Sequence, residues 1–115
     1  MHEYHVMEKI VRTAEETAKR SNALKVLKVS LAVGKLTGFE DGSIRLYFET
    51  LAKGTILEGS ELFIRHIEPK FKCASCDTLF DCKGSNFACT KCGQPGSPTE
   101  IGKEFYIEDM EIESP

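Results

Sequence analysis

The chain contains two Cys-x-x-Cys pairs, Cys73/Cys76 and Cys89/Cys92, with twelve residues between them. Each pair can present two sulfurs to one ion, and the intervening segment is long enough for the pairs to face each other. Four thiolates favour a soft or borderline cation in tetrahedral geometry, and zinc is the usual one. The sequence therefore predicts a four-cysteine zinc site.

The segment around these cysteines, residues 70–100, contains few large apolar residues, among them Phe71 and Phe80. So small a core does not offset the conformational entropy of about thirty ordered residues. Zinc binding to such a site contributes on the order of 10 kcal/mol. We therefore predict a zinc ribbon over residues 70–100 that folds only with its metal.

Other uses of the cysteines fit the sequence less well. Two disulfides require an oxidising compartment, and no feature of the sequence indicates one. A redox-active pair is typical of a strand–helix junction, whereas both pairs here lie in polar segments. A catalytic zinc needs an open coordination position, which four thiolates do not leave. The fifth cysteine, Cys82, has no partner of its own and is predicted to be a surface thiol.

The chain of 115 residues is long enough for one small domain and a metal-stabilised module. Its net charge of −3 disfavours a nucleic-acid-binding protein, which normally carries a basic face. No apolar run approaches the ~20 residues of a membrane span. The opening Met-His-Glu does not resemble a signal peptide. We therefore expect a cytoplasmic protein with neither nucleic acid nor a membrane as a partner.

The residues outside the ribbon predict two helices and three strands. Apolar residues recur at helical spacing over 3–20 and 40–52, and they alternate over 25–34. Two further strands are expected over 60–68 and 103–112. The expected fold class is α+β, a three-stranded sheet with two helices.

The ribbon is expected to be inserted between the second and third of these strands. This order predicts an α+β domain made of residues 1–69 and 101–115, with the zinc ribbon over 70–100 as a second domain. Two linkers would then join the domains and restrict their relative orientation.

The amino terminus offers a second candidate metal site. The amine of Met1, the backbone nitrogen of His2 and the His2 imidazole can close two fused chelate rings on one ion. Glu3 lies close enough in sequence to compete for a fourth position. Such planar, nitrogen-rich sites suit Ni(II) or Cu(II), and binding is expected to be pH-dependent because an α-amino group has a pKa of about 7.7–8.0. His5 either adds a ligand or is a surface histidine, and the residues alone leave both this and the site's function open.

Three further segments, residues 33–38, 54–62 and 102–108, read VGKLTG, GTILEGSEL and GKEFYIE. Together with the Met-His-Glu opening and the paired cysteines, they make the whole chain similar to the HypA/HybF family of hydrogenase-maturation nickel chaperones. Two positions depart from the family pattern. Lys35 stands where an acidic residue is usual, and Cys82 is additional. Neither position belongs to the metal motifs.

The resemblance implies a metallochaperone, not an enzyme, that delivers Ni(II) for maturation of [NiFe]-hydrogenase and, in some members, for urease. Its implied partners are the nickel-handling GTPase HypB and the precursor of the hydrogenase large subunit. Carried over by position, His2 is the principal nickel ligand, supported by Met1 and Glu3, and the four paired cysteines hold structural zinc. Some members place an acidic residue near the nickel after the first strand, where Glu40 or Asp41 stands here.

The residues alone also allow two other functions. One is a zinc-ribbon adaptor that binds other proteins while its amino terminus is inert. The other is a catalyst, which has little support because the sequence shows no Ser/His/Asp set, phosphate-binding glycine loop or open zinc site. A function that survived an amino-terminal extension would favour the adaptor.

Overall fold

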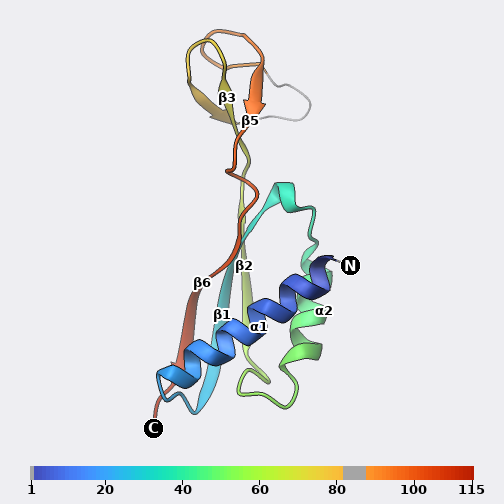
Figure 1. Ribbon diagram of the computed structural model, residues 1–115, viewed down its shortest axis with the longest axis vertical. Helices are drawn as coiled ribbons and strands as arrows, with labels where there is room; N and C mark the ends of the chain where they lie inside the picture. Colours follow the sequence, from blue (N-terminus) through green and yellow to red (C-terminus); the bar gives the residue numbers. More distant parts are fainter. Residues whose placement is uncertain (1, 82–87) are drawn as a thin grey trace. The chain divides into compact units, whose positions relative to one another are not determined.

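The computed structural model describes residues 2–81 and 88–115 and has an α+β fold (Figure 1). The two predicted helices and the three strands predicted outside the ribbon are all present, and the predicted fold class is confirmed. The strands form two three-stranded sheets, with the orders β2-β1-β6 and β4-β3-β5. The elements are, in order, α1 (His2–Arg20), β1 (Lys25–Gly34), the short 3-10 helix η1 (Lys35–Thr37), α2 (Asp41–Ala52), β2 (Glu61–Ile67), β3 (Lys70–Cys73), β4 (Leu79–Asp81), β5 (Gly96–Pro98) and β6 (Phe105–Glu113).

The chain divides into two compact units. The first comprises Met1–Ala32, Phe39–Arg65 and Tyr106–Pro115, and the second comprises Val33–Gly38 and His66–Phe105. The second unit therefore includes the ends of β1 and β2 as well as the cysteine segment. A division into compact units does not show that each part folds separately. The domain boundaries expected from the sequence therefore stay a prediction.

Helix α1 is amphipathic, and one of its faces forms part of the core of the first unit. Glu3 lies in its first turn, and Lys19 and Arg20 lie in its last turn, so that the charges at both ends complement the helix dipole. The buried residues follow one another at spacings of one, three and four, as a single stripe requires. They are Met7, Ile10, Val11, Ala14 and Ala18.

Helix α2 buries Ile44, Phe48 and Ala52, which recur every four residues. Tyr47 continues this stripe at its edge and is half-buried. Its ring meets the ring of Tyr4 on α1 edge-on, with centroids 5.5 Å apart. The two helices of the first unit are thus in direct contact near the start of α1.

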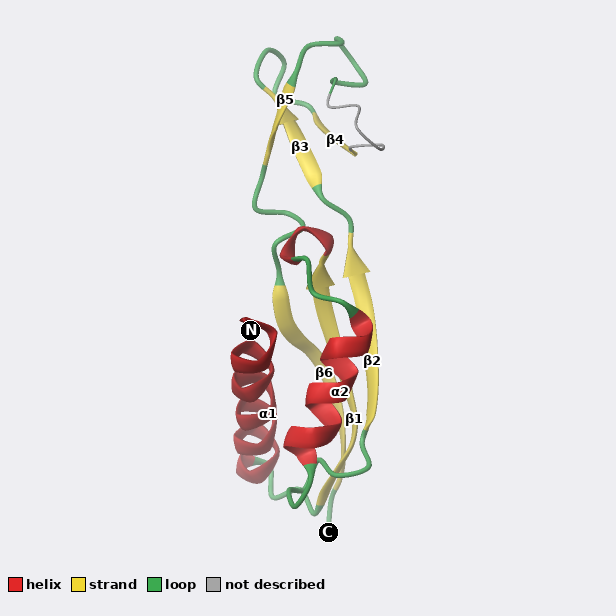
Figure 2. Ribbon diagram, turned by 90° about the vertical axis from the view of Figure 1, so that its right-hand side faces the viewer, coloured by secondary structure: helices red, strands yellow, loops and turns green. Residues whose placement is uncertain are grey.

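The middle strand of the first sheet, β1, is the most buried of the three. Both helices lie on one face of this sheet (Figure 2), and the core between them includes Val29 and Leu31 of β1, which are completely buried. The edge strands retain exposed aromatic residues, Phe63 on β2 at 47% and Tyr106 on β6 at 45%. Neither helix in the described part of the chain is long and apolar enough to cross a membrane.

In the second unit, the end of β1 makes close backbone contacts with the segment that precedes β6. The Gly34 amide donates to the Glu104 carbonyl at 2.7 Å, and the Leu36 amide donates to the Gly102 carbonyl at 2.8 Å. A Cβ atom on Gly34 would lie 2.0 Å from the Gly102 carbonyl oxygen, so only glycine fits there. The first glycine of the VGKLTG segment, Gly34, is therefore required by a backbone contact that leaves no room for a side chain.

Candidate metal centre

A small three-stranded sheet supports the cysteines. Its middle strand, β3, pairs with β4 so that Phe71 lies opposite Phe80, and with β5 so that Cys73 lies opposite Gly96. The two phenylalanine rings are both buried, with centroids 6.1 Å apart. A Cβ atom on Gly96 would lie 2.4 Å from the Phe80 ring, so the glycine makes room for that ring.

The first cysteine pair lies on a tight turn that begins at Cys73, the last residue of β3. The Cys73 amide donates to the Thr78 carbonyl at 3.0 Å, and the Asp77 amide donates to the Cys73 carbonyl at 3.0 Å. Asp77 closes the turn in the left-handed region with φ 57°, a conformation that aspartate tolerates better than most residues. Cys76 therefore turns back toward Cys73.

The second pair repeats the same turn. The Cys89 amide donates to the Gln94 carbonyl at 2.8 Å, and the Gly93 amide donates to the Cys89 carbonyl at 2.9 Å. Gly93 has φ 77° and takes the place that Asp77 has in the first turn. Because both pairs are built on the same turn, each presents its two sulfurs in a similar way.

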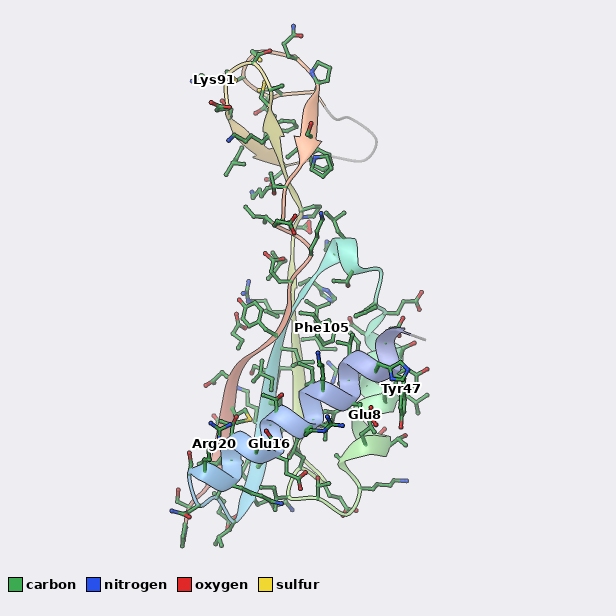
Figure 3. The ribbon with its side chains drawn as sticks, viewed as in Figure 1. Glu8, Glu16, Arg20, Tyr47, Lys91 and Phe105 are labelled. Atoms are coloured by element: carbon green, nitrogen blue, oxygen red, sulfur yellow. The ribbon has the colours of Figure 1, made fainter. Side chains whose placement is uncertain are left out.

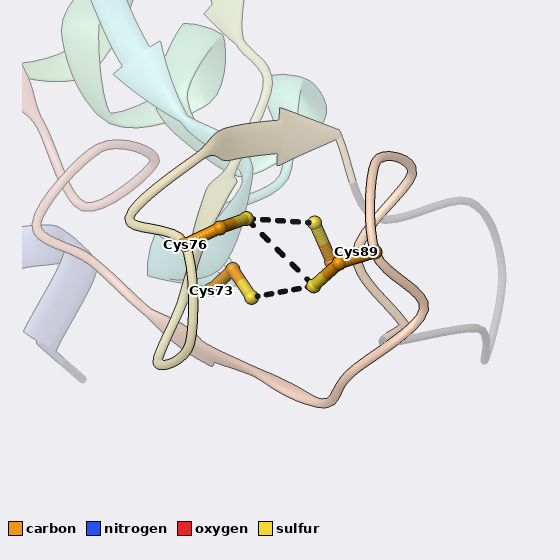
Figure 4. Close-up of side chains that lie close together, drawn as sticks. Cys73, Cys76 and Cys89 are labelled. Carbon is orange, nitrogen blue, oxygen red and sulfur yellow. Dashed lines mark hydrogen bonds between the residues drawn. The ribbon is translucent and has the colours of Figure 1, made fainter.

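The four sulfur atoms converge on one point, as Figure 4 shows. They all lie within 4.8 Å of one another. Cys73 Sγ is 3.3 Å from Cys92 Sγ, and Cys76 Sγ is 3.7 Å from both Cys89 Sγ and Cys92 Sγ. A tetrahedral zinc site with Zn–S bonds of about 2.3 Å requires sulfurs about 3.8 Å apart. The donor set and its spacing therefore fit a zinc ion.

The same distances exclude disulfide bonds within this cluster. A disulfide brings its sulfurs to about 2.05 Å, whereas the nearest pair here is separated by 3.3 Å and all four cysteines are free. In the described residues, this cluster is also the only group of three or more His, Cys, Asp or Glu side chains close enough to share an ion.

Two of the cysteines also serve as the core of this module. Cys73 and Cys89 are buried and form one cluster with Phe71 and Phe80, while the partner cysteine in each pair is exposed. Half of this small cluster therefore consists of metal-binding side chains. A bound ion would stabilise the fold of this module, whose apolar core alone is too small to fold.

Hydrogen bonds make the cysteines differ in acidity. The Thr78 hydroxyl, 3.1 Å from Cys76 Sγ, and the Thr78 amide lower the pKa of Cys76 to about 6. The backbone amides of Cys92 and Lys91 lower the pKa of Cys89. The Gln94 amide lowers the pKa of Cys92. Hydrogen bonding with the Cys73 thiol, burial and hydrogen bonding with the Cys76 and Cys89 thiols outweigh this effect and raise the pKa to about 12. Four thiolates at this distance require a cation to balance their charge.

The structure brings together all four cysteines that the sequence assigned to one site. Sequence reasoning did not identify the residues that support them. Thr78, two residues after Cys76, donates its hydroxyl to the Cys76 sulfur, and the Lys91 amide, two residues after Cys89, donates to the Cys89 sulfur at 3.3 Å. A hydroxyl residue two positions after a cysteine is the signal for the first of these bonds. Cys82 lies outside the described residues.

The amino-terminal candidate site is described only in part. Met1 and the His2 side chain lie outside the described residues, and α1 begins at His2. Glu3 is half-buried in the first turn of α1, whereas His5 is exposed. The nickel ligands expected from the sequence therefore stay a prediction.

The acidic candidates after β1 lie at the start of α2. Glu40 is the residue immediately before this helix, and Asp41 is its first residue. Both belong to the first unit, as do the described residues of α1. Their place near nickel stays a prediction as well.

Comparison with known proteins places the chain in a family. A family model described as "Hydrogenase/urease nickel incorporation, metallochaperone, hypA" matches residues 1–112. The chain is 39% identical over 114 residues to the hydrogenase maturation factor HypA of Caldanaerobacter subterraneus subsp. tengcongensis, covering 98% of this chain and 100% of that protein. It is 35% identical over 113 residues to the hydrogenase maturation factor HypA of Desulfitobacterium hafniense, covering 98% and 99%.

Solved structures have the same fold. The solution structure of the Ni metallochaperone HypA from Helicobacter pylori superposes with a TM-score of 0.69 at 22% identity, covering 98% of both chains. A second solution structure, of a protein named HypA, superposes with a TM-score of 0.77 at 24% identity, covering 100% of this chain and 98% of that one. The resemblance inferred from the sequence motifs is confirmed, and the chain belongs to the HypA family.

Proposed function

We propose that this protein is a nickel metallochaperone for hydrogenase maturation that carries a structural zinc ion. The observation that carries the proposal is the family match over residues 1–112, combined with the four-cysteine cluster that the cysteine spacing predicted. The family description also names urease, so we propose hydrogenase as the main recipient and urease as a second one. In this function the protein transfers an ion and catalyses no covalent reaction.

The zinc ion is assigned to Cys73, Cys76, Cys89 and Cys92. Three of their six sulfur separations are 3.3–3.7 Å and all six lie within 4.8 Å, in agreement with tetrahedral coordination. A closed shell of four thiolates leaves no position for a substrate, so the ion would stabilise the fold of residues 70–100. We accordingly propose that this segment is a zinc-dependent domain inserted into an α+β domain of residues 1–69 and 101–115.

Nickel is assigned to His2, with the Met1 amine and Glu3 as supporting ligands. Because α1 begins at His2, the His2 backbone N–H is among the helix-terminal donors that have no partner inside the helix. Binding nickel through this nitrogen therefore breaks no helical hydrogen bond. A chelate that used an amide nitrogen from the middle of a helix would lose such a bond.

Charge also supports an anionic ligand set at this end of α1. The amino terminus of a helix carries a partial positive charge of roughly half a unit, which stabilises anions and opposes an isolated cation. A deprotonated His2 amide together with the Glu3 carboxylate would neutralise a divalent ion. Nickel must displace a proton from the Met1 amine to bind, so binding would weaken and the carrier would release its ion as the pH falls.

We propose a cytoplasmic setting, with the GTPase HypB and the precursor of the hydrogenase large subunit as the proteins that exchange nickel with this chain. Glu40 or Asp41 at the start of α2 is proposed as an acidic residue near the nickel. The family match supports a role in nickel incorporation but does not itself name these partners.

An amino-terminal extension tests the proposal. Placing Gly-Ser before Met1 turns the free amine into an amide and removes one chelate ring, while the four-cysteine site is unchanged. We expect the extended protein to retain zinc and to lose nickel binding and nickel-dependent activation of a hydrogenase precursor. Full hydrogenase activation by the extended protein would instead support an adaptor with an inert amino terminus.

A further inference from the structure

The first turn of α1 has little support from the core. Among the side chains of this helix that the structure describes, the first that is completely buried is Met7, while Glu3 is half-buried and Tyr4 and His5 are exposed. The first four N–H groups of a helix also have no partner within it. A helix end of this kind opens easily unless a tertiary contact holds it. This turn contains the proposed nickel ligands His2 and Glu3.

A chain of aromatic rings provides such a contact. Tyr47 of α2 meets Tyr4 edge-on, with ring centroids 5.5 Å apart and an interplanar angle of 90°. Tyr4 in turn meets His5 edge-on, with centroids 5.9 Å apart and an angle of 80°. Figure 3 shows Tyr47 beside the amino-terminal turns of α1. The edge-to-face arrangement is the favoured geometry for aromatic pairs.

Tyr47 is fixed on its own helix by packing. Its neighbours Ile44 and Phe48 are completely or almost completely buried, at 0% and 3% exposure. The ring of Tyr47 therefore projects from a well-anchored part of α2, whereas the ring of Tyr4 projects from a poorly anchored part of α1. The contact between the two rings therefore restricts the motion of the first turn of α1.

From this arrangement we infer that Tyr47 is a positioning residue for nickel binding, acting through Tyr4 on the first turn of α1. The inference rests on the proposed nickel site. A chelating group that is already ordered binds an ion more tightly, because less conformational freedom is lost on binding. Loss of the Tyr47 ring should therefore weaken nickel binding without removing a ligand.

The test compares three substitutions in the full-length, zinc-loaded protein with its native Met1. Tyr47→Leu removes the aromatic contact, and Tyr47→Phe keeps the ring and removes only the hydroxyl. Leu46→Ala is the matched control, because Leu46 precedes Tyr47 on α2 and is 60% exposed. Nickel affinity is measured by competition with a chromophoric chelator, and the nickel absorption bands are recorded for each protein.

We expect Tyr47→Leu to weaken nickel binding about three- to tenfold, the effect of losing one aromatic pair. The nickel absorption bands should be unchanged, because the ligands are the same. Tyr47→Phe should retain the native nickel affinity, and Leu46→Ala should also leave it unaltered. Amide hydrogen exchange at Val6 and Met7, in the turn of α1 that follows Tyr4 and His5, should become faster only in Tyr47→Leu.

An unchanged or tighter nickel affinity in Tyr47→Leu would overturn the inference while leaving the nickel site itself intact. Equal weakening by Leu46→Ala would show a general loss of structure and would overturn it. Weaker nickel binding by Tyr47→Phe would show that the hydroxyl, and not the ring contact, is required, and would overturn it as well. If the native protein binds no nickel, the proposed function fails first, and the inference fails with it.

Discussion

Arg65 and Glu108 form an ion pair that spans the middle strand of the first sheet. Arg65 lies on β2 and Glu108 on β6, and β1 runs between these strands. Arg65 Nε donates to Glu108 Oε1 at 2.8 Å, and both residues line a surface cavity with Ser30 of β1. The hydrogen bond and charge of Arg65 lower the pKa of Glu108, and Glu108 raises the pKa of Arg65. The pair thus connects two edge strands that share no backbone hydrogen bonds.

This pair predicts a small pH dependence of stability. Because folding lowers the pKa of Glu108, its contribution is present above the unfolded carboxyl pKa of about 4.3 and is lost as the pH falls through the lower folded value. Glu108→Gln should therefore reduce the acid sensitivity of unfolding below pH ~4.3, as measured by urea titrations at several pH values. The effect should be modest since both side chains are solvent-exposed. Glu111→Gln on the same strand is the control, and an equal effect there would contradict a specific role for the pair.

Removal of zinc should affect the two units differently. A strong chelator at neutral pH is expected to unfold the cysteine module of residues 70–100, because its described core consists of Phe71, Phe80 and two cysteines. The helices of the first unit have their own buried stripes and should remain folded. Backbone NMR spectra with and without chelator would show collapse of the module's dispersed resonances and preservation of those from α1 and α2. Loss of the helical resonances would contradict this independence.

Phe80→Ala should weaken zinc binding without removing a ligand. Phe80 is 4% exposed and packs on Phe71, and the deletion of a buried phenylalanine ring costs about 3–5 kcal/mol. Since metal binding and folding of the module are coupled, this cost should appear as weaker zinc affinity in a competition titration. Leu79→Ala, the neighbouring residue at 53% exposure, should have little effect. Equal zinc affinities for native protein and Phe80→Ala would show that the module folds without this core.

Two Gly→Ala substitutions should change stability in opposite directions. At Gly34 the new methyl group would collide with the Gly102 carbonyl, and such overpacking costs about 1–3 kcal/mol. At Gly42, in α2, a Cβ atom meets nothing within 4 Å, so alanine should stabilise the helix by up to about 1 kcal/mol. Thermal unfolding of both variants measures the difference. A tolerated Gly34→Ala would mean that the backbone contact of Gly34 with Gly102 can separate at little cost.

Features that depend on local sequence were predictable. The helical spacing of Met7, Ile10, Ala14 and Ala18 predicted the extent of α1, since burial of one stripe defines an amphipathic helix. The cysteine spacing predicted the four-cysteine cluster, because two identical turns place their sulfurs in the same way.

Features that depend on tertiary approach were not predictable. The edge-on contact of Tyr4 with Tyr47 and the ion pair of Arg65 with Glu108 join residues far apart in sequence, and no local pattern indicates either pairing. The bond from Thr78 to Cys76 is local, but a threonine in a turn has many other uses. The periodicity of β6 also changes where Glu108 and Asp109 are both exposed, which a strict two-residue alternation does not foresee.

A nickel titration by calorimetry on tag-free protein with its native Met1, next to His2→Ala, tests the assignment of nickel to the amino terminus most directly. The zinc content of both proteins is measured in parallel. We predict that both proteins retain zinc and that only the native protein binds nickel. Nickel binding of equal strength by His2→Ala would contradict the assignment, because the amino-terminal site could not then be the nickel site.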